Sequence, residues 1–81
     1  MENIRDRLYK AVASVVAVDE DEFVPGASFV DDFNADSFDL VEITMNVEDE
    51  FNITIPTDDV PKLRTVGEVM EYVEKRVKEN E

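Results

Sequence analysis

The stretch from Asp36 to Phe51 constrains the fold more than any other part of the chain, because it predicts a helix with two separate apolar faces. One set of largely apolar positions recurs at the spacing of a core-facing helical surface. This first set is Leu40, Ile43, Thr44, Val47 and Phe51. A second set, Phe38, Val41 and Met45, lies roughly 130° around the helix from the first. The core of a small domain can cover only one face, so we expect the other to meet a partner.

Acidic side chains flank the second apolar face. Glu42 and Asp49 lie on one side of it, and Glu48 lies on the other. Asp39 lies a little further round the helix. A narrow apolar strip between carboxylates is typical of a docking face for a partner with an apolar depression and a basic rim. The spacing therefore predicts a protein-binding face.

The start of this helix carries a serine. Asp36 is placed as the N-cap, which makes Ser37 the first helical residue. A hydroxyl there points out past the end of the helix, where the dipole and the free N–H groups favour an attached phosphate. A capped amphipathic helix whose first-turn serine has no role is the simpler alternative.

Short motifs spread over nearly the whole chain share one pattern. They are Ala27-Ser28-Phe29-Val30-Asp31-Asp32, Asn34-Ala35-Asp36-Ser37-Phe38-Asp39, Val41-Glu42, Glu48-Asp49-Glu50-Phe51, Ile55-Pro56 and Thr65-Val66. Together they resemble the acyl carrier proteins. The resemblance implies a covalent 4′-phosphopantetheine arm, taken from coenzyme A, on Ser37. It also implies a recognition helix whose contacts are Asp36, Phe38, Asp39, Val41, Glu42, Met45 and Glu48.

The same resemblance implies the partners. They would be a phosphopantetheinyl transferase and acyl-processing enzymes with basic docking patches, while the carrier itself would be a monomer and not an enzyme. The first expectation is dissociated (type II) fatty acid biosynthesis. Discrete size favours a dissociated system, and the closeness of the motifs favours fatty acid synthesis. A specialised carrier for polyketide, modified-lipid or aminoacyl groups is the alternative. A further alternative is an unmodified acidic adaptor that uses Phe38, Val41 and Met45 as a helix-in-groove ligand.

Three departures from the family pattern bear on the finer function. Phe38 stands where a leucine usually follows the serine, and Phe33-Asn34 replaces the common Leu-Gly. Thr44 puts a hydroxyl on the core-facing side, where the family commonly has an aliphatic residue and shelters the acyl chain. A helical threonine can bond the backbone one turn back, which would satisfy that hydroxyl. We therefore expect altered partner choice and altered chain sequestration.

Composition excludes several classes of function. The 81 residues predict one domain, and the absence of cysteine and histidine removes thiolates, imidazole bases, disulfides and ordinary zinc sites. No Lys or Arg lies between Ala11 and Pro61, although most of the 21 acidic residues do. With a net charge of −13, this field repels nucleic acid and anionic membranes. No signal peptide or membrane-length apolar run is visible, so a cytoplasmic protein without membrane insertion is expected.

One metal motif needs weighing. Residues 32–36 match the opening of a calcium loop, D-x-[DN]-x-[DN]. The turn glycine is replaced by Ser37 and the bidentate glutamate by Ile43, so we reject an EF-hand and expect no metal site.

The remaining elements follow from periodicity and turn residues. We expect a helix over residues 3–17, although its β-branched last turn is weak. A long connection follows, held to the bundle by Phe23, Val24, Phe29, Val30 and Phe33. After the helix over residues 37–50 we expect an extended linker at 53–55 and one short helical turn at 56–60. Thr57 would cap that turn, and Pro61 would end it.

A capping box at Thr65 and Glu68 predicts the start of the last helix. Its core side would be Val66, Val69, Met70, Val73 and Val77. The expected fold is therefore all-α, a small antiparallel bundle of three long helices plus one short helix, with a long first loop.

Overall fold

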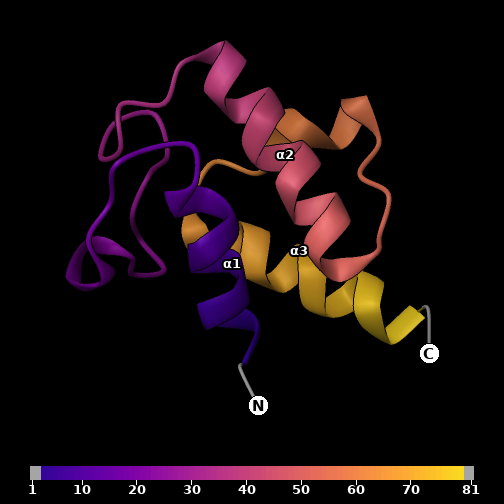
Figure 1. Cartoon of the computed structure of the whole chain (residues 1–81). Helices are drawn as coiled ribbons and strands as arrows, with labels where there is room; N and C mark the ends of the chain where they lie inside the picture. The colour runs from indigo at the N-terminus through magenta and orange to yellow at the C-terminus, as the bar shows by residue number, and fades with distance from the viewer. Residues whose placement is uncertain (1–2, 80–81) are drawn as a thin grey trace.

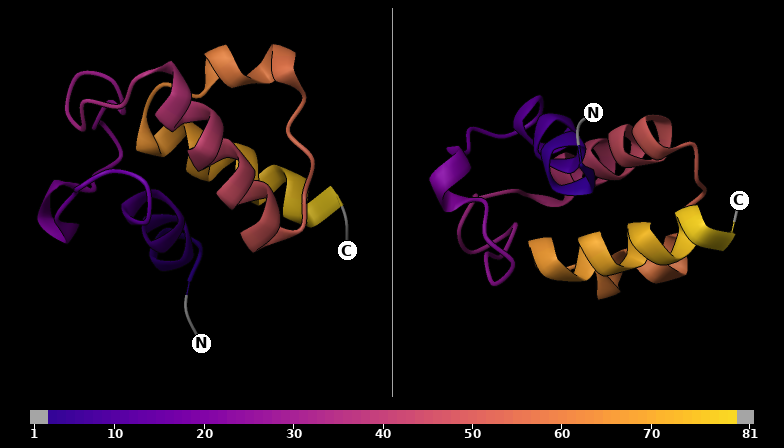
Figure 2. Two further views of the ribbon diagram at one scale, coloured as in Figure 1. Left: turned by 45° about the horizontal axis from the view of Figure 1, so that its top comes forward. Right: turned by 90° about the horizontal axis from the view of Figure 1, so that it is seen from below.

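A computed structural model describes residues 3–79. Its elements are α1 (Ile4–Ala13), η1 (Glu20–Glu22), α2 (Ser37–Phe51), η2 (Thr57–Lys62) and α3 (Val66–Glu79). Figure 1 shows α1 and α2 running in opposite directions, with the long loop between them at one end of the bundle. Seen from below, α1 and α2 lie on one side and α3 with η2 on the other (Figure 2). The prediction of a small helical bundle with a long first loop is confirmed.

The core lies where the apolar faces of the three α-helices meet the loop. Its most deeply buried side chains are Leu8, Val12, Phe23, Phe29, Val47, Val66 and Val73. Burial of each such side chain contributes about 1.5–3 kcal/mol. Among the described residues no polar or charged side chain is buried, so burial of apolar surface dominates the stability of this domain.

The first helix ends four residues earlier than predicted. α1 ends at Ala13, and the chain turns at Ser14, whose N–H donates to the Lys10 carbonyl at 3.2 Å and whose Oγ donates to the Ala11 carbonyl at 2.9 Å. The β-branched residues that follow are poor helix formers. The turn still buries Val16 and Val18, so these apolar residues serve the core without continuing the helix.

Aromatic rings attach the long loop to the bundle, as predicted for Phe23, Phe29 and Phe33, which are all buried. The Phe23 ring meets the Tyr9 ring edge-on, with 5.3 Å between centroids. Phe23 and Phe33 stack at 6.2 Å. The prediction was wrong for Val24 and Val30, which are 49% and 53% exposed. In this irregular segment alternate residues do not share one side, so apolar character alone did not identify the inward ones.

The loop also pairs with the segment before α3, a contact that no pattern in the sequence predicted. Ser28 and Thr65 form an isolated antiparallel β-bridge. The Phe29 N–H donates to the Arg64 carbonyl at 3.1 Å, and the Gly67 N–H donates to the Pro25 carbonyl at 2.9 Å. A Cβ at Gly67 would lie 3.0 Å from that carbonyl oxygen, so a glycine permits this close approach.

The short helix before α3 corrects two expectations. η2 continues to Lys62, past Pro61, and Pro56 rather than Thr57 occupies its N-cap position without a side-chain bond. It is a 3₁₀-helix with i→i+3 bonds. At its start the Asp59 N–H donates to the Pro56 carbonyl at 2.9 Å, and at its end the Leu63 N–H donates to the Val60 carbonyl at 3.0 Å. Pro61 lies between these donors, so its missing N–H does not break the turn.

Asp59 ties η2 to α3. Its Oδ2 accepts a 2.7 Å hydrogen bond from the Tyr72 hydroxyl and lies 3.5 Å from Arg76 Nη2, while its Oδ1 accepts from Lys62 Nζ at 3.3 Å. The hydrogen bond from Tyr72 is the main cause that lowers the pKa of Asp59, and the two cations lower it further against partial burial. η2 is therefore held against α3 by side chains as well as by its apolar contacts.

Candidate functional site

A reciprocal capping box sets the start of α2. The Asp39 N–H donates to Asp36 Oδ1 at 2.8 Å, and the Asp36 N–H donates to Asp39 Oδ2 at 3.3 Å. Ser37 is the first residue of the helix, as predicted, and is exposed. None of the hydrogen bonds found among the described residues uses Ser37 Oγ. The cap thus fixes the backbone of Ser37 and leaves its hydroxyl accessible.

The chain just before the cap explains one departure from the family pattern. Asn34 has a φ of 56°, in the left-handed region that glycine and asparagine adopt most readily. The Ala35 N–H then donates to the Phe29 carbonyl at 2.9 Å, and Ala35 and Phe33 are buried on either side. Asn34 can therefore replace the common glycine, and the turn still directs the chain into α2.

Ser37 lines an open hollow of about 550 Å³ between α2, the long loop and η2. Its walls include Phe29, Leu40, Val60 and Leu63. The same four side chains also line a smaller, deeper cavity of about 20 Å³ beside Thr44. A space of about 10–15 Å³ holds one water molecule, so the deeper cavity is too small for a ligand unless its walls move. The hollow and the cavity together mark an apolar route from Ser37 toward the core.

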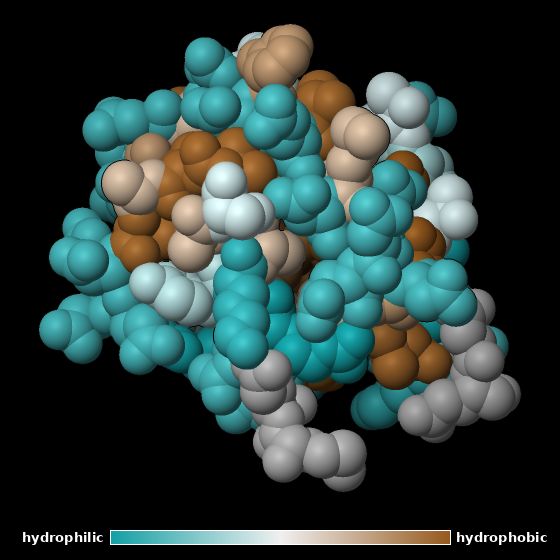
Figure 3. All heavy atoms as spheres, in the orientation of Figure 1, coloured by the Kyte–Doolittle hydropathy of each residue, from teal (hydrophilic) through white to brown (hydrophobic). Residues whose placement is uncertain are grey.

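The second apolar face of α2 is exposed, as its spacing predicted. Phe38, Val41 and Met45 are 72%, 56% and 57% exposed, whereas Ile43 and Val47 on the first face are buried. In the space-filling view, apolar atoms reach the surface at the upper end, where α2 begins (Figure 3). We call Phe38, Val41 and Met45 the apolar strip.

The predicted acidic neighbours of the strip differ in their surroundings. Asp36 and Glu42 are exposed, while Asp39 is half-buried within the capping box. Glu48 is also half-buried, and its Oε2 accepts a 2.8 Å hydrogen bond from the Ile55 N–H. Glu48 thus holds the linker after α2, a role that helical spacing could not show because its partner lies beyond the helix.

Thr44 satisfies its hydroxyl locally. Its Oγ1 donates to the Leu40 carbonyl at 2.8 Å, one turn back, as expected for a helical threonine. The side chain lies in the wall of the deeper cavity with Ile43 and Val47. This cavity therefore has a polar atom in its wall that is already bonded and costs little in the folded state.

The acidic field around α2 carries a prediction about cations. In the part of the chain described, no group of three or more acidic side chains is arranged to hold a metal ion. Magnesium or calcium at millimolar levels should nevertheless raise the melting temperature, because diffuse binding relieves the repulsion of a chain with net charge −13. The check is a melting curve against sodium chloride at matched ionic strength; identical curves would contradict the prediction.

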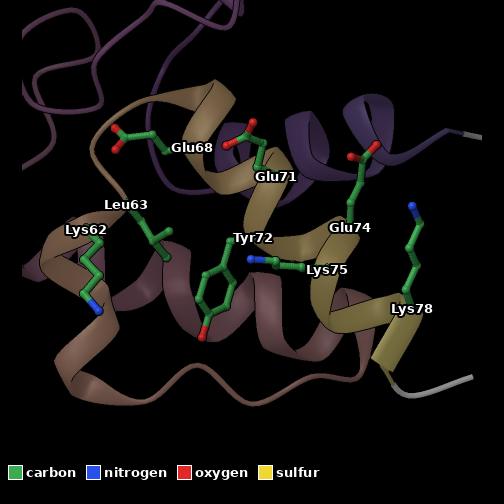
Figure 4. Close-up of a pocket in the computed structure, with 8 residues that line it drawn as sticks. All are labelled: Lys62, Leu63, Glu68, Glu71, Tyr72, Glu74, Lys75 and Lys78. Atoms are coloured by element: carbon green, nitrogen blue, oxygen red, sulfur yellow. The ribbon is translucent and has the colours of Figure 1, made fainter.

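A second large hollow, of about 490 Å³, lies along α3 and η2 (Figure 4). Lysines and glutamates mix in its lining: Lys62, Lys75 and Lys78 with Glu68, Glu71 and Glu74. Because three positive and three negative side chains share this lining, the hollow attracts neither a cation nor an anion strongly. The hollow at Ser37 remains the candidate site.

The comparison with known families agrees with this geometry. A family model described as the phosphopantetheine attachment site matches residues 6–73, which is most of the chain and includes the whole site. Domains of this family bear covalent 4′-phosphopantetheine, and they interact with a phosphopantetheinyl transferase and with acyl-processing enzymes. In addition, none of the helices among residues 3–79 is long and apolar enough to cross a membrane. This chain belongs to the phosphopantetheine-attachment family, and its helical bundle is that of an acyl carrier protein.

Proposed function

We propose that this protein carries acyl groups on a 4′-phosphopantetheine arm attached to Ser37. The observation that supports this most directly is the position of Ser37, an exposed hydroxyl at the first turn of a capped helix, beside an apolar hollow. When bound, the arm supplies the thiol that the chain itself lacks, and acyl groups are carried on it as thioesters. The residues around Ser37 fit the arm because they leave the attachment atom open and offer a surface beside it.

The chain contributes one reacting atom to its own modification. Ser37 Oγ forms a bond to the β-phosphorus of coenzyme A, the pyrophosphate bond breaks, and adenosine 3′,5′-bisphosphate leaves with the bonding electrons. The proton of Ser37 is assigned to a base on the transferase, because the carboxylates of Asp36 and Asp39 already accept hydrogen bonds in the capping box. The free N–H groups at the start of α2 favour the negative charge that remains on the attached phosphate.

The direct test is the intact mass of the protein after incubation with a transferase and coenzyme A. We expect a gain of one phosphopantetheine per chain. No gain with several transferases of different specificity would overturn the proposal and favour the unmodified adaptor. The domain is proposed to be a carrier and not an enzyme, so no acyl-transforming activity is expected from the modified protein alone.

The apolar strip and its acidic neighbours are proposed to dock the transferase and the acyl-processing enzymes. The neighbours are Asp36, Asp39, Glu42 and Glu48. The large exposure of the strip supports this role, since apolar side chains gathered on one helix face commonly mark a protein-binding surface. We also propose that the protein is a monomer, in which no second copy covers this face.

Val41→Asn should therefore lower kcat/KM of the transferase by about tenfold, the effect of losing about 1.4 kcal/mol at a central apolar contact. Val24→Asn is the matched control, because Val24 is 49% exposed but lies in the loop before Pro25. Both variants should unfold at nearly the wild-type urea concentration. Equal kinetic effects of the two substitutions would contradict a docking role for the strip.

Fatty acid biosynthesis by separate enzymes is the proposed pathway, with polyketide, modified-lipid and aminoacyl carriers as the alternatives. The apolar walls of the hollow and the deeper cavity support a hydrocarbon cargo. The check is the mass of the thioester on protein purified from its native cell. A polar aminoacyl group there would overturn this choice of pathway and leave the carrier role intact.

Thr44→Val tests whether the deeper cavity receives the acyl chain. We expect unchanged modification of Ser37 and a larger gain in melting temperature for the acylated form than for the unacylated form. The reason is that a second methyl group replaces a hydroxyl in the cavity wall, beside Ile43 and Val47. Equal stabilisation of the two forms would count against a chain-lining role for Thr44.

A further inference from the structure

Arg64 is the one basic residue, among residues 3–79, that lines the hollow with Ser37. Four other bases form ion pairs elsewhere: Arg5 with Asp6, Arg7 with Glu50, and Lys62 and Arg76 with Asp59. Lys75 and Lys78 line the other hollow, along α3 (Figure 4). Among the described residues of this acidic chain, a single cation thus shares a hollow with Ser37.

The backbone at Arg64 is fixed, whereas its side chain is not. Its carbonyl accepts the Phe29 N–H at 3.1 Å, and the next residue, Thr65, forms the β-bridge to Ser28. Arg64 is nevertheless exposed, and no hydrogen bond or ion pair found in the described part of the chain involves its guanidinium. The loop therefore holds Arg64 at the hollow and leaves its charged group available.

A phosphate on Ser37 would enter strongly acidic surroundings. Asp36 and Asp39 form the cap next to it, and the carboxylate-bearing residue Asp31 lines the same hollow. The negative phosphate and these carboxylates repel each other, and the repulsion would push the phosphate and the arm away from the surface. A guanidinium offsets that repulsion best, because its planar fork matches two phosphate oxygens.

We propose that Arg64 binds the phosphate of the arm on Ser37 and so holds the arm against the hollow between visits to partner enzymes. This inference rests on the proposed function, since it requires the arm. Arg64 acts here as a positioning residue. Asp31 lines the same hollow, and we expect its carboxylate to compete with the phosphate for the guanidinium of Arg64.

The test compares unmodified and modified protein by nuclear magnetic resonance. In the wild type, the Arg64 Nε–H resonance should shift on modification, and Arg64→Gln should move the phosphorus resonance of the arm toward that of free phosphopantetheine. Arg64→Gln should also make the arm thiol react about two- to fivefold faster with a maleimide, the range expected for losing one exposed ion pair. Arg64→Lys keeps the positive charge but lacks the planar guanidinium, so its phosphorus resonance and thiol reactivity should lie between those of the wild type and Arg64→Gln.

Two further variants sharpen the result. Lys75→Gln removes the same charge from the opposite hollow and should leave the phosphorus resonance and the thiol reactivity unchanged. Asp31→Asn should slow the thiol reaction, because it removes the competitor. A normal mass gain with an unshifted Arg64 resonance, or equal effects of Arg64→Gln and Lys75→Gln, would overturn this inference alone. A chain that gains no phosphopantetheine would overturn the proposed function together with it.

Discussion

Ser37→Ala should abolish phosphopantetheine attachment completely, so that the intact mass stays constant after incubation with transferase and coenzyme A. The expected effect is all-or-none, because the substitution removes the atom to which the phosphorus would bond. The free energy of unfolding should change by no more than about 0.5 kcal/mol, since Ser37 is exposed and its hydroxyl has no hydrogen bond among the described residues. Loss of modification would then be separable from loss of fold.

The other two serines provide matched controls for this experiment. Ser28 lines the same hollow, but its Oγ accepts the Asp31 N–H at 3.1 Å within the loop. Ser14 Oγ lies at the far end of α1 and accepts a 2.9 Å hydrogen bond from Asn46 Nδ2. Ser28→Ala and Ser14→Ala should both keep the full mass gain. A gain that persists in Ser37→Ala and disappears in Ser28→Ala would move the attachment site to the loop.

Local patterns in the sequence were sufficient for α2 and its faces. The alternation of Val41 and Met45 with Ile43 and Val47 follows helical geometry alone, so the exposed and buried sets could be separated without any tertiary information. The Asp36 cap was equally local, because donor and acceptor are three residues apart. These are the parts of the site that the sequence could predict.

Features that depend on distant partners were missed. The pairing of residues 25–29 with residues 64–67 joins segments whose contact no periodicity reveals. That pairing also brings Arg64 to the hollow that Ser37 lines, so a cation at the site could not be foreseen from a chain whose bases lie near its ends. The early end of α1 is a smaller case, in which β-branched residues were buried by a turn instead of by a helix.

The loop that carries this pairing is expected to be the most sensitive part of the fold, and Phe23 tests it. Its side chain is 1% exposed, packs on the rings of Tyr9 and Phe33, and has the Arg5 guanidinium 5.5 Å from its ring centroid. The Phe23 carbonyl also accepts a hydrogen bond from Arg5 Nη2 at 3.2 Å. Truncating the ring would leave a cavity between α1 and the loop.

Phe23→Ala should lower the free energy of unfolding by about 3–5 kcal/mol, the usual cost of removing a buried ring. A domain of this size has only about 5–15 kcal/mol in total, so we expect a much lower urea midpoint and a substantial unfolded fraction at 37 °C. The measurement is urea unfolding followed by circular dichroism. Val24→Ala is the control, because Val24 is next to Phe23 in the sequence but its side chain is half exposed. This substitution should lower the free energy of unfolding by less than about 0.5 kcal/mol.

The same variant separates the role of the loop in stability from its role at the site. At low temperature, where folded Phe23→Ala still predominates, the transferase should modify Ser37 at nearly the wild-type rate if the pairing of Phe29 with Arg64 survives. A slower rate in fully folded protein would mean that the Phe23 ring also sets the position of α2. A loss of stability below about 1 kcal/mol, or one equal to that of Val24→Ala, would contradict the view that buried aromatic rings hold this long loop in place.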